Sequence, residues 1–137
     1  LCKLPRNAEG YMGRLRCVQE ISAVTAACMM VKTSVFKAVG GFDEELKVAF
    51  NDIDLCMKVR KYGVKIVFTP YAELYHYESK SRGMEDTPEK QLRFSREVNC
   101  FRRKWERELL KGDPYYNPNL TLNNTDCSLR KQEKNGD

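Results

Sequence analysis

Residues 40–56 read GGFDEELKVAFNDIDLC, and they contain the end of one predicted helix and the start of another. Gly40 and Gly41 end the first helix, because glycine accepts backbone angles that are denied to other residues. Thr33 or Ser34 can cap the start of that short helix through a side-chain oxygen. The glycine pair therefore marks a break between two helices.

The second helix is predicted to start at Asn51 or Asp52 and to run to Tyr62, with Gly63 as its stop. Its first turn is acidic, as the positive end of a helix dipole favours. Its apolar residues are expected to share one side: Phe50, Ile53 and Met57.

Two other stretches have the pattern of strands. Residues 23–31 are apolar or small on both alternating faces, which is typical of a strand buried on both sides in an α/β sheet. Residues 64–68 alternate sufficiently for a second strand. After Pro70, three residues share one face of a further extended run: Ala72, Leu74 and His76. Residues 1–20 show no clear period and are expected to form an irregular lead-in.

A long amphipathic helix is predicted from Thr87 to Leu110. Thr87 suits the N-cap, Pro88 suits the first helical position, and Gly112 marks the end. An apolar stripe at helical spacing is expected to pack on the body of the protein: Phe94, Val98, Phe101, Trp105 and Leu109. Together with the doubly buried strand predicted at residues 23–31, these helices indicate the α/β class.

The composition fits one compact domain with a polar surface: 137 residues, 42% of them hydrophobic and 31% charged. No stretch approaches the roughly 18 apolar residues that cross a bilayer, and no leader opens the chain, so a soluble protein is expected. The six cysteines form no close pairs, which favours a reduced, cytoplasmic protein without structural zinc. We expect a domain over residues 1–120 and a polar, disordered tail over residues 121–137.

Asp52 and Asp54 are the first candidates for chemistry. On the simpler interpretation, Asn51 is the N-cap and both carboxylates merely oppose the helix dipole. On the other interpretation, one of them is a general base that takes a proton from an attacking hydroxyl. Residues two apart on a helix diverge by about 200°, so only one of the two can face a given pocket.

His76 is the single histidine and ends an apolar row, where a histidine is more often a core residue than a ligand. Residues 77–83 are polar and cationic, of the kind that can fold over a phosphate group. The net charge of +5 also favours anionic partners.

Five segments, taken in order, resemble the C-terminal half of inverting GT-A glycosyltransferases of family two. They are residues 24–29, 40–44 and 50–56, Gly63, and residues 71–76. The resemblance covers roughly residues 20–120 and implies the C-terminal portion of a Rossmann-like mixed sheet with flanking helices. The long C-terminal helix would follow that portion.

The resemblance implies that Asp52 is the general base. The family usually has Glu-Asp at this helix start, and this chain has Asn51-Asp52, so the aspartate is kept. Asn51 and Asp54 are expected to contact substrate beside it. Asp52-Ile53-Asp54 also matches the Asp-x-Asp motif that binds metal and nucleotide diphosphate in many sugar transferases, although that motif usually follows a hydrophobic strand.

The resemblance also assigns the remaining site residues. A glycine-Phe-Asp segment lines the sugar and acceptor pocket: Gly41, Phe42 and Asp43. His76 coordinates a divalent cation, Mg or Mn, and Lys80 and Arg82 contact the donor diphosphate.

Nothing before Gly10 matches the donor-binding half of such enzymes, so the chain is expected to be a C-terminal fragment that is inactive alone. The whole enzyme would take a nucleotide-diphosphate sugar donor and a glycan, lipid-linked or protein acceptor, and would serve polysaccharide biosynthesis without binding nucleic acid. A position at the inner face of a membrane and self-association through an exposed sheet edge are both compatible with this interpretation.

Two other classes stay open. A non-catalytic module could use the basic face of the helix over residues 87–110 on anionic membrane or nucleic acid. The glutamates interspersed on that helix favour an ordinary solvated surface instead: Glu89, Glu97, Glu106 and Glu108. A small scaffold domain without a ligand is the third class.

Overall fold

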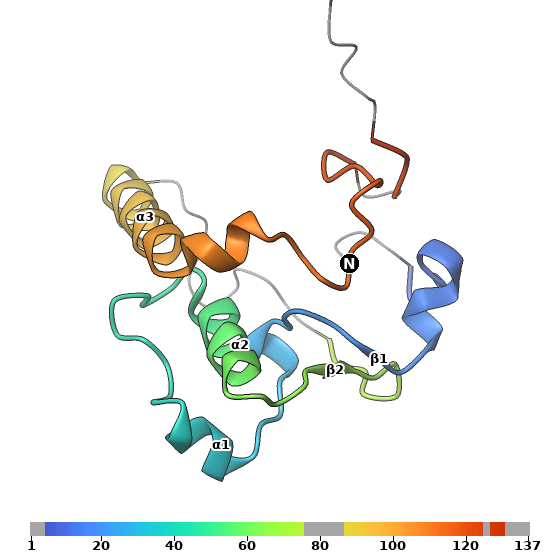
Figure 1. The fold of residues 1–137 in the computed structure, drawn as a ribbon, viewed down its shortest axis with the longest axis horizontal. Coiled ribbons are helices and arrows are strands. Elements are labelled where there is room, and N and C mark those ends of the chain that lie inside the picture. Colours follow the sequence, from blue (N-terminus) through green and yellow to red (C-terminus); the bar gives the residue numbers. More distant parts are fainter. Residues whose placement is uncertain (1–4, 76–86, 125–126, 131–137) are drawn as a thin grey trace, which may run out of the picture.

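The computed structural model describes residues 5–75, 87–124 and 127–130. Within these ranges the chain is a mixed α/β structure with a small sheet and a long C-terminal helix, so the predicted class is confirmed at that level (Figure 1). In chain order the elements are η1 Tyr11–Arg16, β1 Gln19–Glu20, η2 Ala26–Cys28, α1 Thr33–Ala38, α2 Asn51–Lys61, β2 Val67–Phe68 and α3 Pro88–Leu110.

The sheet of the described residues has two antiparallel strands, β1 and β2. Gln19 is paired with Phe68 and Glu20 with Val67. The Ile21 N–H donates to the Ile66 carbonyl at 3.0 Å, which continues the pairing by one step. The strand predicted at residues 64–68 therefore forms only in its last part, and β1 falls in the stretch for which an irregular lead-in was expected.

The prediction of a doubly buried strand over residues 23–31 is wrong. Residues 26–28 form the 3-10 turn η2, and the Thr25 hydroxyl accepts the Ala27 N–H at its start. Met30 is 99% exposed. An apolar run predicts burial only when neighbouring strands cover it, and among the described residues the sheet consists of β1 and β2 alone. A Rossmann-like sheet is accordingly not seen in this part of the chain.

The first predicted helix is present as α1, but Lys32 rather than Thr33 or Ser34 is its N-cap, and no side chain caps it. Its end is as expected from the glycines. The Gly41 N–H donates to the Phe36 carbonyl at 2.9 Å, and Gly40 and Gly41 have φ angles of 77° and 62°. Both values lie in the left-handed region that favours glycine.

The second predicted helix is present as α2, which ends at Lys61, one residue before the predicted Tyr62, and which has a different N-cap. Phe50, with φ of 63°, precedes the helix in a left-handed conformation, and Asn51 is its first residue. The Phe50 ring stacks on Phe101 with centroids 5.0 Å apart and lies 6.0 Å from Phe94. Such packing can hold a residue in a backbone conformation that costs about 1–3 kcal/mol.

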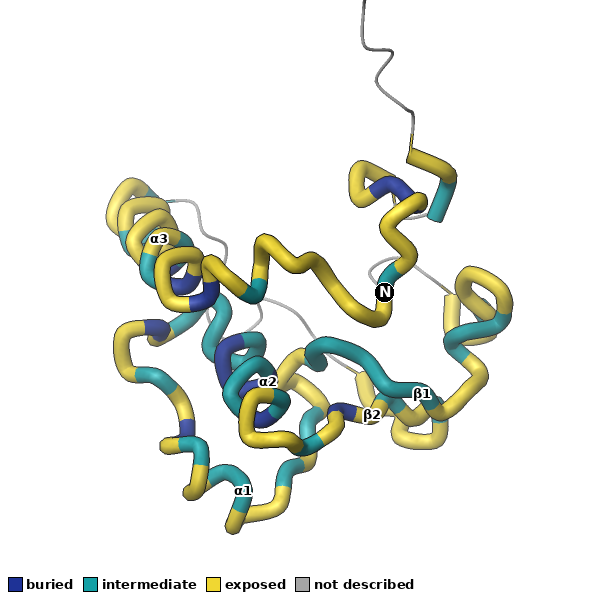
Figure 2. Tube along the Cα trace, in the orientation of Figure 1, coloured by how far each residue is buried: buried dark blue, intermediate teal, exposed yellow. Residues whose placement is uncertain are grey.

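Helix α2 contributes to two hydrophobic clusters, and Figure 2 shows that several of its residues are buried. One side contributes to a cluster under α1 and the sheet: Leu55, Cys56, Val59 and Ile66. On the other side, Ile53 and Met57 pack against a second cluster. It consists of Leu46 from the loop before α2 and of Phe101 and Trp105 from α3. The helix therefore connects the sheet side of the molecule to α3.

Helix α3 has the predicted bounds and cap. The Thr87 hydroxyl accepts the Lys90 N–H, and Pro88 opens the helix. The predicted apolar stripe packs only in its middle, since Phe94 is 43% and Leu109 46% exposed. The buried residues are Glu97, Phe101 and Trp105, so a carboxylate belongs to the packed face. Trp105 departs from helical angles, with φ of −115°, and marks a kink.

Beyond α3, the described residues include defined backbone contacts in the region expected to be a disordered tail. Leu120 bridges Leu129, the Thr121 N–H donates to the Ser128 carbonyl, and Leu120 and Thr121 are buried. The domain boundary at residue 120 stays a prediction. Among the described residues, no helix combines the length and apolar character needed to cross a membrane.

Candidate functional site

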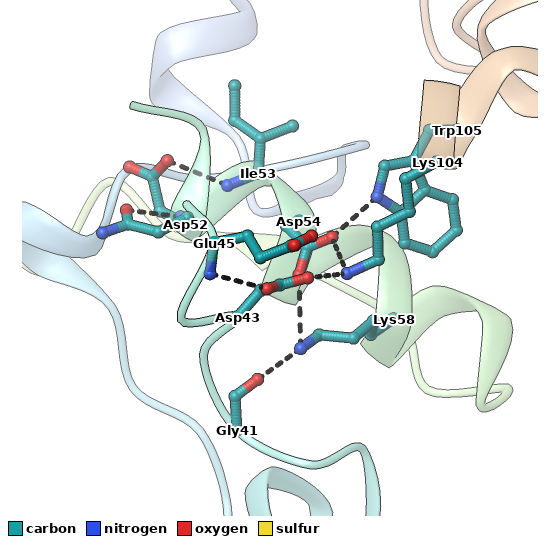
Figure 3. A network of polar contacts seen from close by, with 10 residues as sticks. Gly41, Asp43, Glu45, Asp52, Ile53, Asp54, Lys58, Lys104 and Trp105 are labelled. Atoms are coloured by element: carbon teal, nitrogen blue, oxygen red, sulfur yellow. Dashed lines mark hydrogen bonds and ion pairs between the residues drawn. The ribbon is translucent and has the colours of Figure 1, made fainter. Parts of the chain in front are cut away.

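Three segments meet around the start of α2: the loop after α1, the first turns of α2, and the C-terminal half of α3 (Figure 3). The loop carries Gly41 and Asp43, and α2 carries Asp52 and Asp54. Lys104 and Trp105 come from α3. The structure thus brings together most of the predicted site residues that it describes.

Asp52 is half-buried at the start of α2, and backbone N–H groups orient its carboxylate. Oδ1 accepts the Ile53 N–H at 2.8 Å and Oδ2 accepts the Ala26 N–H at 3.1 Å. The first bond uses one of the free N–H groups of the helix start, and the second ties α2 to η2. Each oxygen retains a second acceptor position. Asn51 Oδ1 accepts the Asp52 N–H at 2.7 Å, so the amide supports the same turn.

Asp54 is fully buried, with none of its surface exposed. Its Oδ1 accepts the Trp105 indole N–H at 2.8 Å and lies 2.7 Å from Lys104 Nζ. Its Oδ2 lies 3.2 Å from Lys58 Nζ. A carboxylate enclosed in this way is not placed for the substrate contact suggested by the sequence. Asp52 and Asp54 also point to different sides of α2, as helical geometry requires, so they do not form one Asp-x-Asp cluster (Figure 3).

The glycine-Phe-Asp segment lies beside this group. The Gly41 carbonyl accepts a hydrogen bond from Lys58 Nζ, and Asp43 Oδ1 accepts the Glu45 N–H at 3.0 Å. Asp43 Oδ2 pairs with Lys104, and this bond is the main reason why the pKa of Asp43 lies below its ordinary value. Phe42 is 47% exposed and packs edge-on against the Phe36 ring at 5.5 Å. The segment is held in place by two lysines.

Three predicted site residues lie outside the described residues: His76, Lys80 and Arg82. Their roles stay predictions. Among the described residues, no group of three or more His, Cys, Asp or Glu side chains could hold a metal ion.

A cavity of about 510 Å³ lies elsewhere, between the N-terminal segment and the residues after β2. Arg6, Arg16, Tyr71 and Glu73 contribute to its lining, and Arg6 Nε is 2.7 Å from Glu73 Oε2. The cavity is not lined by any predicted site residue that the structure describes.

No sequence pattern used above identified the lysines and the tryptophan of this site. The Asp54–Lys58 spacing of four residues is a helical ion-pair pattern and could have indicated one partner. Lys104 and Trp105 lie 61 residues from Asp43 and 51 from Asp54, respectively, so no local pattern connects them.

Known proteins similar to this chain are much longer than it is. The chain is 56% identical over 126 residues to the uncharacterized protein y4gI of Sinorhizobium fredii, which covers 91% of the chain and 14% of that protein. It is 39% identical over 115 residues to the O-antigen biosynthesis protein RfbC of Myxococcus xanthus, covering 84% of the chain and 9% of that protein.

A shorter match, 36% identical over 62 residues, is to N-acetylglucosaminyl-diphospho-decaprenol L-rhamnosyltransferase of Mycobacterium tuberculosis, covering 45% of the chain and 20% of that protein. The chain therefore spans a fifth or less of the length of each of these relatives. No family model matches it, and no solved structure is significantly similar. The names of the second and third relatives suggest a glycosyltransferase family.

Proposed function

We propose that this chain is the base-bearing part of a glycosyltransferase that moves a sugar from a nucleotide-diphosphate donor to an acceptor hydroxyl with inversion. The names of two relatives, an O-antigen biosynthesis protein and a rhamnosyltransferase, support the general class. The observation that carries the proposal is the position of Asp52. It lies half-buried at the start of α2, with both carboxylate oxygens oriented by backbone N–H groups.

In this mechanism Asp52 is the general base. Its free acceptor positions receive the acceptor hydroxyl, and the proton passes to the carboxylate as the hydroxyl oxygen attacks the anomeric carbon. The bond between that carbon and the diphosphate oxygen breaks, and the nucleoside diphosphate leaves with the electron pair. A single displacement of this kind inverts the configuration at the anomeric carbon.

The neighbouring residues would form the acceptor side of the site. Phe42 presents a half-exposed ring beside Gly41 and Asp43, and an aromatic face is suited to pack against a sugar ring. Lys80 and Arg82 would contact the diphosphate. A divalent cation held by His76, Mg²⁺ or Mn²⁺, would supply positive charge that offsets the charge of the leaving diphosphate.

The whole protein would complete the enzyme. We propose that residues 1–120 are the C-terminal part of a GT-A domain and that the Rossmann-like sheet and donor site form with sequence outside this chain. The chain alone would then be inactive. The acceptor would be a glycan, a lipid-linked sugar or a protein, and the enzyme would work in the cytoplasm or at the inner face of a membrane.

The rival interpretation, a basic module that binds anionic surfaces through α3, receives less support. Lys104 of α3 is used inside the chain, in ion pairs with Asp43 and Asp54. Arg93 Nε lies 3.8 Å from the buried Glu97 carboxylate. These two cations are less available for phosphate groups, whereas the exposed arginines of α3 keep this interpretation open: Arg96, Arg102, Arg103 and Arg107.

The test uses the protein expressed from its complete gene, in a sugar-transfer assay with nucleotide sugars and Mn²⁺. Asp52→Asn keeps the size of the side chain and removes the base, so kcat should fall by about 10²–10⁴-fold. Glu44→Gln is the matched control, because Glu44 is an exposed carboxylate in the loop before α2. Near-normal transfer by Asp52→Asn would rule out its role as the base. Salt-sensitive binding to anionic vesicles that survives this substitution, with no transfer by the wild type, would favour the rival.

A further inference from the structure

One face of α3 contacts the loop between α1 and α2 along its length. Lys104 pairs with Asp43, Cys100 Sγ donates to Glu45 Oε2 at 3.4 Å, and Glu97 Oε2 accepts the Ala49 N–H at 2.6 Å. Positions 97, 100 and 104 lie on one face of a helix because they are three and four residues apart. The loop therefore runs antiparallel to α3, with a contact near each end and one between.

The same face of α3 also contacts α2 through Asp54. Lys104 Nζ lies 2.7 Å from Asp54 Oδ1, and the Trp105 indole N–H donates to that oxygen at 2.8 Å. Lys58 reaches Asp54 from one turn further along α2 and donates to the Gly41 carbonyl. Asp54 thus holds two lysines, and each lysine also binds the Gly41–Asp43 segment (Figure 3).

Forming this buried charged arrangement costs free energy, so the positions of its atoms need a reason besides stability. Burying a carboxylate costs several kcal/mol, and opposite charges repay this only with good geometry and further hydrogen bonds. Asp54 is fully buried, whereas the Lys58 and Lys104 side chains are 18% and 32% exposed. Replacing buried ion pairs by apolar side chains of similar volume is often neutral or stabilising in proteins. The charged set adds direction, because each lysine must face two oxygen atoms at once.

We propose that Asp54 and Lys104 are positioning residues, which place the Gly41–Asp43 segment at the correct distance from Asp52. Asp54 follows Asp52 by two residues on the same helix, so the position of its carboxylate is fixed relative to the base. Lys104 connects the Asp54 carboxylate to Asp43, and Lys58 connects it to the Gly41 carbonyl. The inference rests on the proposed function, since it concerns how the acceptor hydroxyl is presented to the base.

The experiment compares Lys104→Met with Lys111→Met in the protein expressed from its complete gene. Both substitutions remove a lysine from the C-terminal end of α3, and Lys111 is exposed at the C-cap. We expect Lys104→Met to raise the acceptor KM by about tenfold, because small displacements of substrate-positioning groups have effects of this size or larger. The donor KM should stay unchanged. In Lys104→Arg, which keeps the positive charge, the acceptor KM should stay close to the wild-type value. A loss of stability alone would lower the active fraction and hence the apparent kcat, and would leave KM unchanged.

Hydrogen exchange supplies a readout that does not depend on activity. Amides of residues 41–46 should exchange faster in Lys104→Met than in Lys111→Met, whereas the amides of β1 should not change. Lys104→Gln, which keeps a shorter hydrogen-bond donor, takes the place of Lys104→Met if the latter does not fold.

The outcomes separate the two proposals. If the wild type transfers sugar and Lys104→Met has an unchanged acceptor KM or unchanged exchange in residues 41–46, the positioning role is wrong and the proposed function stands. If the wild type transfers no sugar from any donor, the proposed function is wrong, and the inference that rests on it is overturned as well.

Discussion

Asp52 and Asp54 have the same side chain on the same helix, yet their surroundings give them different properties. Asp52 is half-buried and its carboxylate accepts two backbone N–H groups. Asp54 is fully buried and contacts Trp105, Lys104 and Lys58. Asp52 keeps acceptor positions that a substrate hydroxyl could use under the proposed function, whereas both oxygens of Asp54 face lysines of the protein. The proposed general base and a buried, ion-paired carboxylate are therefore separated by about half a turn of helix.

The difference predicts unequal effects on stability. Asp54→Asn should lower the free energy of unfolding by about 2–4 kcal/mol, because it leaves two partly buried lysines without their shared charge partner. The measurement is urea unfolding at neutral pH. Asp52→Asn is the matched control and should cost only about 1 kcal/mol, because its amide replaces one of the two oxygens that accept backbone N–H groups. Equal stability of the two variants would show that Asp54 does not hold the two lysines.

At the level of elements, the turn between α1 and the loop depends on two adjacent glycines in different surroundings. Gly40 and Gly41 both have left-handed φ angles. A Cβ atom on Gly41 would lie 3.1 Å from the Phe36 ring, whereas a Cβ atom on Gly40 would have no atom within 4 Å. Position 41 is therefore restricted by both backbone and packing, and position 40 by the backbone alone.

Alanine substitution distinguishes these two restrictions. Gly40→Ala should cost about 1 kcal/mol of stability from the left-handed backbone alone. Gly41→Ala should cost more, by about another 1–2 kcal/mol, since the Phe36 ring must also move. Differential scanning calorimetry of both variants provides the comparison. A Gly40→Ala variant less stable than Gly41→Ala would contradict the packing around Phe36.

The helices and strands differ in how well local sequence predicts them. Helices α2 and α3 match their predicted bounds to within one residue because their stop residues and the Thr87-Pro88 start act on neighbouring backbone groups. The strand predicted at residues 23–31 is absent because a strand needs a hydrogen-bonding neighbour. The apolar stripe predicted on α3 is only partly correct, because the buried face includes Glu97 and because Phe94 and Leu109 are exposed.

At the scale of the whole molecule, the ion pairs between α3 and the loop make stability depend on pH. The pKa of Asp43 is lowered by its hydrogen bond with Lys104, by the Glu45 N–H and, further away, by Lys58. Burial lowers the pKa of Lys104, but its hydrogen bonds with Asp43 and Asp54 outweigh burial, and the net shift is upward. Both groups are thus more stable in their charged forms in the folded protein.

The signs of these shifts predict the pH dependence of unfolding. A lowered Asp43 pKa contributes stability above its unfolded pKa of about 4, and this contribution is lost as the pH falls through the folded value. A raised Lys104 pKa contributes stability below its unfolded pKa of about 10.4, lost as the pH rises through the folded value. In urea unfolding from pH 7 to pH 2, Lys104→Met should therefore lose less stability than the wild type. Parallel curves would show that the Asp43–Lys104 pair is not formed.

The sequence by itself determined the extent of α2 and α3 to within one residue, which residues could carry a base, and that Asp52 and Asp54 could not share one pocket. These properties depend on neighbouring residues and on the helical repeat, so they can be predicted locally. Only the tertiary structure decided which carboxylate is buried, that Lys104 and Trp105 reach it from α3, and that residues 23–31 form no strand. Burial and pairing depend on contacts between residues far apart in the chain, and no local pattern contains that information.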